Sequence, residues 1–230
     1  MEASKTTPTT PTVPKPQSNY QDIVHYLAAC KTALKNAALP AIAPKLLGIG
    51  YTPAIIGAKL QEVATLETLH EQQKKEYGEQ YKATVTYSAK ENALHETYSK
   101  NLTIARVVFK NDVAAQVALG LPGERKKSKS GFQAQALQFY NGVLKNADYQ
   151  TALAIRGITE AILTAQKTGF EGLSDLAASQ KKETGEAQAA TKKRDMALDN
   201  FADWMSDFKK MAIVALSDSP QLREQLGWKE

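Results

Sequence analysis

The chain has 230 residues, with 29 basic and 24 acidic side chains, a net charge of +5 and 43% hydrophobic residues. This composition supplies enough apolar surface for a core and excludes a chain that is disordered throughout. The single cysteine, Cys30, excludes a disulfide framework and a zinc site built from cysteines.

Neither a membrane span nor a secretory signal is expected. No apolar run approaches the roughly 20 residues that a membrane helix needs. The residues that follow Met1 are polar and lack the apolar stretch of a signal peptide. We therefore expect a cytoplasmic protein.

Residues 1–17 predict a disordered tail. They hold five threonines, four prolines and one valine, which cannot bury apolar surface. The simplest interpretation is a tether, and the alternative is a docking peptide for a partner. Ser18 and Gln21 then fit a capping box at the start of the folded body.

The body is predicted to be all-α. It is rich in Ala, Leu, Lys, Glu and Gln, and the alternation typical of strands is almost absent. The prolines that follow the tail fall at junctions between periodic segments, where helices tolerate them: Pro40, Pro44, Pro53, Pro122 and Pro220.

An internal repeat organises the body. Residues 51–121 match residues 158–228 at a fixed offset of 107, with 19 identities in 71 positions and no gap. Upstream, Leu34–Ala37 matches Leu144–Ala147 at an offset of 110. The sequence therefore predicts a tandem duplication, divided into a tail (1–17), repeat 1 (18–121), a basic linker (122–131) and repeat 2 (132–230).

Helix-boundary signals recur in the two repeats. Thr52 and Thr159 are expected to cap the starts of helices, and Asp112 and Ser219 the starts of short last helices. Gly120 and Gly227 suit the position just after a helix.

One long helix per repeat is expected between these signals, because apolar residues recur at a spacing near 3.5 with no proline or phase break. We favour two long antiparallel helices that form a coiled-coil-like rod, with small residues such as Gly78 and Gly185 allowing close approach at its middle. Short helices at 19–38 and 132–147 would pack on its ends, with Cys30 as a small buried residue. The alternative is a multi-helix bundle with hairpins at Gly78 and Gly185.

The segment 37–58 is apolar but is broken by three prolines and several glycines. We interpret it as a hinge packed on the end of the rod. The alternative is a loop that contacts a membrane or a partner through five side chains: Leu46, Leu47, Ile49, Ile55 and Ile56.

The sharpest charge cluster is the loop 124–130. It could contact phosphates or acidic lipid headgroups through Arg125, Lys126, Lys127 and Lys129. The simpler interpretation is a solvated linker, because a dedicated nucleic-acid protein shows a broader basic face.

No motif supports catalysis, a cofactor or a metal. Glu67 and His70 have the spacing of a di-iron ligand pair, but the matching positions of repeat 2 are Ser174 and Ala177. Glu91 and His95 could form a surface pair or a weak metal contact. We therefore expect a protein without enzymatic activity, cofactor or metal.

The C-terminal pattern runs from Trp204, Phe208, Ala212 and Leu216 to Pro220, Leu222, Leu226 and Gly227. It resembles that of uncharacterised bacterial all-helical proteins, which implies helical bundles or repeats and no established activity. Our first hypothesis is a scaffold or interaction module that binds a protein partner or itself. A membrane-acting protein that uses 37–58 comes second, and a nucleic-acid binder that uses 124–130 comes third.

Overall fold

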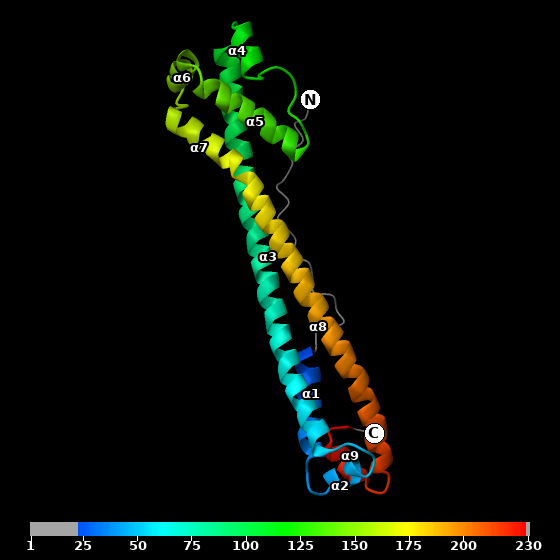
Figure 1. The fold of residues 1–230 in the computed structure, drawn as a ribbon. Coiled ribbons are helices and arrows are strands. Elements are labelled where there is room, and N and C mark those ends of the chain that lie inside the picture. The colour runs from blue at the N-terminus through cyan, green and yellow to red at the C-terminus, as the bar shows by residue number, and fades with distance from the viewer. Residues whose placement is uncertain (1–22, 229–230) are drawn as a thin grey trace. The chain divides into compact units, whose positions relative to one another are not determined.

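The computed structural model describes residues 23–228, and every regular element in this range is an α-helix. The prediction of an all-α fold is confirmed (Figure 1). The predicted tail at 1–17 and the capping box at Ser18 lie outside the described residues. The helices are α1 (Ile23–Ala37), α2 (Ala43–Leu47), α3 (Pro53–Val108), α4 (Val113–Ala118), α5 (Lys129–Leu144), α6 (Ala147–Ala154), α7 (Glu160–Glu171), α8 (Leu173–Ala215) and α9 (Pro220–Gln225).

The chain divides into two units that differ from the predicted repeats. Unit 1 combines the residues up to Gly78 with those from Gly185 onward, and unit 2 is Glu79–Thr184. The two division points, Gly78 and Gly185, are themselves 107 residues apart. Each unit therefore takes the first half of one repeat and the second half of the other.

Unit 1 packs α1 and α2 against the first half of α3 and the second half of α8. Its core holds Leu34 of α1, Leu66 of α3 and Phe208 of α8, each at most 2% exposed. Tyr51 lies 5.0 Å from Phe208, and Gln73 bonds Arg194, so the two long helices run antiparallel within this unit.

Unit 2 packs α4, α5, α6 and α7 around the second half of α3. Its core is aromatic and is centred on Tyr98 of α3, Phe139 and Tyr140 of α5, and Phe170 of α7, all at most 1% exposed. Desolvation by burial raises the pKa of Tyr140, and Asn101 donates a hydrogen bond to its hydroxyl oxygen over 3.2 Å. The buried phenol is therefore held neutral and satisfied.

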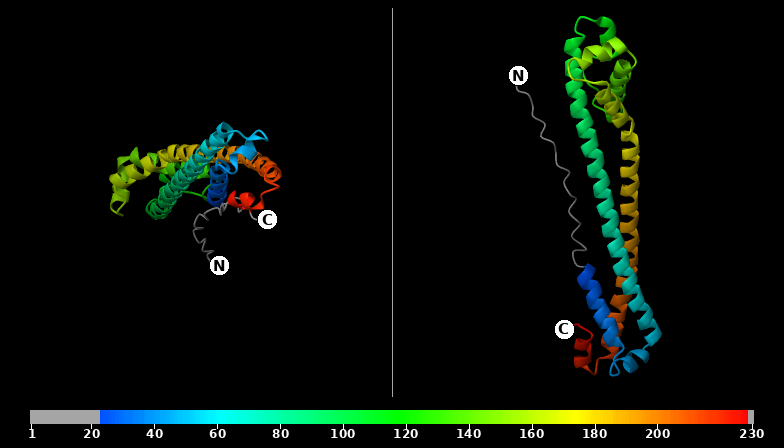
Figure 2. Two further views of the ribbon diagram at one scale, coloured as in Figure 1. Left: turned by 90° about the horizontal axis from the view of Figure 1, so that it is seen from below. Right: turned by 90° about the vertical axis from the view of Figure 1, so that its left-hand side faces the viewer.

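The helix α3 passes through Gly78, and α8 passes through Gly185, without interruption (Figure 2). The alternative with hairpins at these glycines is wrong, because a single glycine costs a helix only about 1 kcal/mol relative to alanine. The expected close approach is wrong as well. A Cβ atom at either glycine would meet no atom within 4 Å.

The long helix predicted for repeat 2 is interrupted at Gly172, between α7 and α8. Gly169 and Gly172 lie one turn apart, and Ser174 donates a side-chain hydrogen bond to the Glu171 carbonyl over 3.1 Å. Glycines together with a serine are a known cause of helix bending, because they weaken the regular backbone ladder.

Helix ends recur at the offset of the sequence repeat. The bounds of α3 and α4 reappear 107 residues later as the start of α7, the end of α8 and both ends of α9. Gly50 and Gly157 share a positive φ (93° and 81°), as do Gly120 and Gly227 (62° and 82°). Only glycine adopts this left-handed conformation without strain, so these glycines close equivalent turns.

Three of the four predicted helix caps are present. The side chains of Thr52, Thr159 and Asp112 accept hydrogen bonds from the backbone N–H groups three residues later, over 2.8 to 3.4 Å. Ser219 makes no such bond, so the prediction is wrong there, and Pro220 alone marks the start of α9.

Candidate functional site

The apolar segment 37–58 belongs mostly to the core of unit 1. Leu46 and Ile56 are 1% and 4% exposed, and Ile49 packs against the same core. Two of the five side chains proposed for membrane or partner contact, Leu47 and Ile55, are exposed. Leu46 and Ile56 are therefore unavailable to a membrane or a partner while unit 1 is folded.

No helix within residues 23–228 has both the length and the hydropathy of a membrane span.

Arg125 of the basic loop is held by its own unit. Its guanidinium donates a hydrogen bond to the hydroxyl of Tyr98 over 2.8 Å and bonds to the carbonyls of Gly120, Pro122 and Gly123 over 3.3 Å each. These bonds tie the loop to the aromatic core of unit 2. Burial raises the pKa of Tyr98, and the nearby Arg125 opposes that rise.

Lys129 also has partners within unit 2. Its ammonium group lies 3.0 Å from the Glu91 carboxylate and 4.7 Å from the ring centroid of Tyr87. The hydrogen bond to Glu91 raises the pKa of Lys129. Lys126 and Lys127 are exposed. Half of the four-residue cluster proposed to contact polyanions is therefore engaged inside the protein.

The carboxylates that were weighed as metal ligands have other partners. Glu67 forms an ion pair with Lys31 over 2.9 Å and ties α1 to α3. Glu91 accepts a hydrogen bond from Tyr87 as well as from Lys129, and His95 stacks on Phe132 with ring centroids 4.3 Å apart. The expectation that the protein binds no metal stays a prediction.

Two pairs of repeated aliphatic residues are exposed in both units. Ile55 and its counterpart Ile162 are 39% and 38% exposed, and Val107 and Val214 are 67% and 65% exposed. The sequence identified these identities but not their exposure. Because long helices run antiparallel in unit 1, Ile55 at the start of α3 and Val214 near the end of α8 lie at the same end of that unit. In unit 2 the pair is Ile162 and Val107. We call each pair an apolar end surface.

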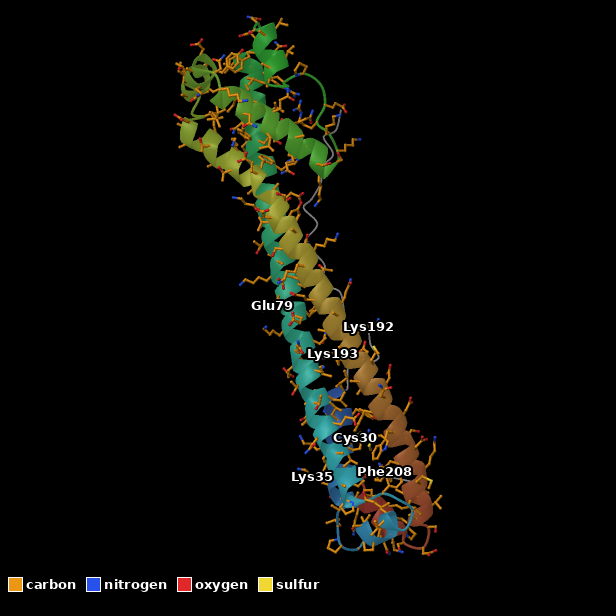
Figure 3. The ribbon with its side chains drawn as sticks, viewed as in Figure 1. Cys30, Lys35, Glu79, Lys192, Lys193 and Phe208 are labelled. Carbon is orange, nitrogen blue, oxygen red and sulfur yellow. The ribbon has the colours of Figure 1, made fainter. Side chains whose placement is uncertain are left out.

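A groove that sequence reasoning missed opens in unit 1 between α1, α8 and the residues that follow α9. Its volume is about 510 Å³. Cys30 of α1 lies on one wall (Figure 3). Residues along all three segments line it: Tyr26, Ala29, Cys30, Thr32, Ala202, Met205, Ser206, Lys209, Leu226, Gly227 and Trp228.

The missed signal was available in the sequence. At the offset of 110, Ala29 and Cys30 align with Phe139 and Tyr140, so small residues in repeat 1 correspond to large ones in repeat 2. Cys30 itself is 5% exposed, as expected for a small apolar residue. Its burial satisfied the simplest interpretation and hid the space beside it.

Comparisons of the chain with protein-family models, with curated proteins and with solved structures found no match. The argument for function therefore depends on the two apolar end surfaces, the basic loop and the groove.

Proposed function

We propose that this protein is a non-enzymatic helical scaffold that binds other protein molecules through its apolar end surfaces. The proposal is carried by one observation. Ile55 and Val107 are identical to their counterparts Ile162 and Val214, and all four are exposed.

Packing explains the other aliphatic identities between the repeats but not these two. Leu66 and Leu173 are identical because both lie in cores, and so are Leu119 and Leu226. An exposed aliphatic side chain gains little in the isolated protein, whereas its burial against a partner contributes about 25 cal/mol per Å². The same surface on each unit favours a scaffold that binds two similar partners or copies of itself.

The two other functions have weaker support. A membrane-acting loop would need Leu46 and Ile56, which unit 1 buries. A nucleic-acid site would need Arg125 and Lys129, which already have hydrogen-bond partners. The apolar end surfaces need no rearrangement before they bind.

Site-specific photo-crosslinking in the cells that make the protein tests the proposal. A photoreactive benzoyl-phenylalanine replaces Ile55, Val214, Ile162 or Val107 in separate variants. Val24 and Met196 are the matched controls, because they are 59% and 58% exposed but lie away from the ends of the long helices. We expect protein adducts at the four end positions and none at the controls.

Binding measurements then establish that the adduct reports a specific contact. The crosslinked protein, or a second copy of this chain, is purified and its affinity is measured. We expect Ile55→Gln with Val214→Gln to weaken binding by at least about tenfold, because apolar burial is lost. Val24→Gln with Met196→Gln should leave it unchanged. Adducts with lipid, or equal adducts at all six positions, would contradict the proposal.

A further inference from the structure

The groove of unit 1 stands where unit 2 is filled by aromatic rings. At the offsets of the repeat, Met205 corresponds to Tyr98, and Ala29 and Cys30 correspond to Phe139 and Tyr140. The three rings of unit 2 are fully buried, with centroids 5.1 to 5.9 Å apart. Unit 2 therefore shows how this arrangement of helices packs when no space is left.

Protein interiors are normally packed to the density of organic crystals, so an opening of about 510 Å³ at an aromatic cluster's position calls for an occupant. Pockets that bind small molecules have volumes in the range of about 300 to 1,000 Å³ and are mainly apolar, with few polar groups. The groove has both properties, since Met205, Leu226 and Trp228 give it an apolar wall.

The charge on the groove is positive. Lys209 is its only charged lining residue, and it corresponds to Leu102, which is 4% exposed in the core of unit 2. Within residues 23–228, no carboxylate pairs with Lys209, and its ammonium group lies 5.8 Å from the centroid of the Trp228 ring. Tyr26 and Cys30 contribute no charge, because burial raises the pKa of each.

We propose that this groove binds a small amphipathic carboxylate, with its apolar body between α1 and α8 and its carboxylate at Lys209. The hydroxyl groups of Tyr26, Thr32 and Ser206 line the same groove and can donate hydrogen bonds to the carboxylate oxygens. A cationic amphiphile would face Lys209 without a compensating acid. The proposal is independent of the apolar end surfaces, because neither Ile55 nor Val214 lines the groove.

Titration of the full chain with octanoate, octan-1-ol and octylammonium tests the proposal, since these probes share a chain and differ in the headgroup. The chain has two tryptophans, and their indole N–H resonances serve as reporter and control. Trp228 lines the groove, whereas Trp204 stacks on Phe208 in the core. We expect octanoate to shift the Trp228 resonance more than that of Trp204, and to bind more tightly than octanol, with octylammonium weakest.

Two substitutions locate the site and its charge. Ala29→Phe places in the groove the ring that unit 2 carries at this position, and because Ala29 is exposed the variant should fold. It should reduce octanoate affinity by at least about tenfold. Lys209→Gln should reduce octanoate affinity by about threefold and leave octanol affinity unchanged, since exposed ion pairs are weak. Lys210→Gln is the control, because Lys210 pairs with Asp207 instead.

The single cysteine gives a second measurement. Cys30 lines the groove, so bound octanoate should slow its alkylation by iodoacetamide, and Ala29→Phe should abolish this protection. Equal affinity for octanoate and octylammonium would overturn the assignment of an anion. A Trp228 resonance that octanoate does not move, or octanoate binding that Ala29→Phe leaves intact, would overturn the site.

Discussion

Arg194 of α8 donates a hydrogen bond from Nη1 to Oε1 of Gln73 in α3 over 2.9 Å, and Arg194 is only 8% exposed. The same guanidinium bonds Asp195 over 2.6 and 2.8 Å. In unit 2, the counterpart of Gln73 is Gln180, which bonds the neutral Thr84 over 3.3 Å. The two units therefore join their long helices through related glutamines but with different electrostatics.

Arg194→Ala should lower the free energy of unfolding of unit 1 by about 2 kcal/mol, because it leaves Gln73 and Asp195 without this donor. Both tryptophans, Trp204 and Trp228, belong to unit 1, so tryptophan fluorescence during urea unfolding measures this unit. Lys193→Ala, at the exposed neighbouring position, should change the value by less than about 0.5 kcal/mol. Equal effects of the two substitutions would contradict a structural role for the buried guanidinium.

Unit 1 should lose stability in mildly acidic solution through His70. Burial lowers its pKa, Lys74 and Arg194 lower it further, and Glu71 acts in the opposite direction. The imidazole Nδ1 is buried and has no hydrogen-bond partner among the described residues. Below the ordinary pKa of 6.5, the unfolded chain binds a proton that folded unit 1 does not, so protons favour unfolding.

The tryptophan-monitored unfolding of wild type and His70→Gln at several pH values measures this linkage. Above pH 7 the difference in stability between the two proteins should be constant. As the pH falls below about 6.5, wild type should lose stability relative to the variant, whose glutamine does not titrate. Parallel stability curves down to the range where carboxylates titrate would show that the pKa of His70 is the same in both states.

Glycine-to-alanine substitutions should have opposite effects at different positions. Gly78→Ala and Gly185→Ala should each stabilise the protein by about 0.5 to 1 kcal/mol, since the new Cβ meets no atom within 4 Å. Gly142→Ala should destabilise unit 2 by about 1 kcal/mol or more, because its Cβ would lie 2.6 Å from Cδ2 of the buried Leu119. Hydrogen exchange resolved by peptide separates effects on residues 79–184 from effects elsewhere. Stabilisation by Gly142→Ala would indicate that α4 shifts away freely.

Arg125 and Lys127 should differ although both belong to the basic loop. Arg125→Ala should destabilise unit 2 by about 1 to 2 kcal/mol, because it removes bonds to Tyr98 and three backbone carbonyls. Lys127→Ala should have an effect below about 0.5 kcal/mol. Hydrogen exchange within residues 79–184 measures both values. If Arg125→Ala left exchange unchanged but removed salt-dependent DNA binding, the nucleic-acid hypothesis would gain support.

The helices could be predicted from the sequence because their signals are local. Thr52, Thr159 and Asp112 act as caps, and the absence of proline between Pro53 and Val108 allows α3 to continue. The break at Gly172 was missed because repeat 1 has Thr65 at the matching position, and the shared periodicity concealed the difference.

The composition of the two units could not be read from the repeat. A matching stretch shows which residues are equivalent, but it does not show whether a helix packs against its own repeat or the other one. Likewise, Arg125 and Lys127 are both basic residues in one loop, and only the position of the Tyr98 hydroxyl distinguishes them. The groove at Cys30 depends on atoms that are absent, and periodicity does not register missing volume.

The division of unit 1 between the two ends of the sequence sets an order for folding during synthesis. Unit 2 is continuous in the sequence, so it can form once Thr184 has left the ribosome. Residues 23–78 expose their apolar faces until the chain reaches Leu226, roughly 150 residues later. At ordinary translation rates this interval is on the order of 10 to 30 s. The nascent first half of unit 1 is thus a natural substrate for chaperones, and the C-terminal residues complete the fold.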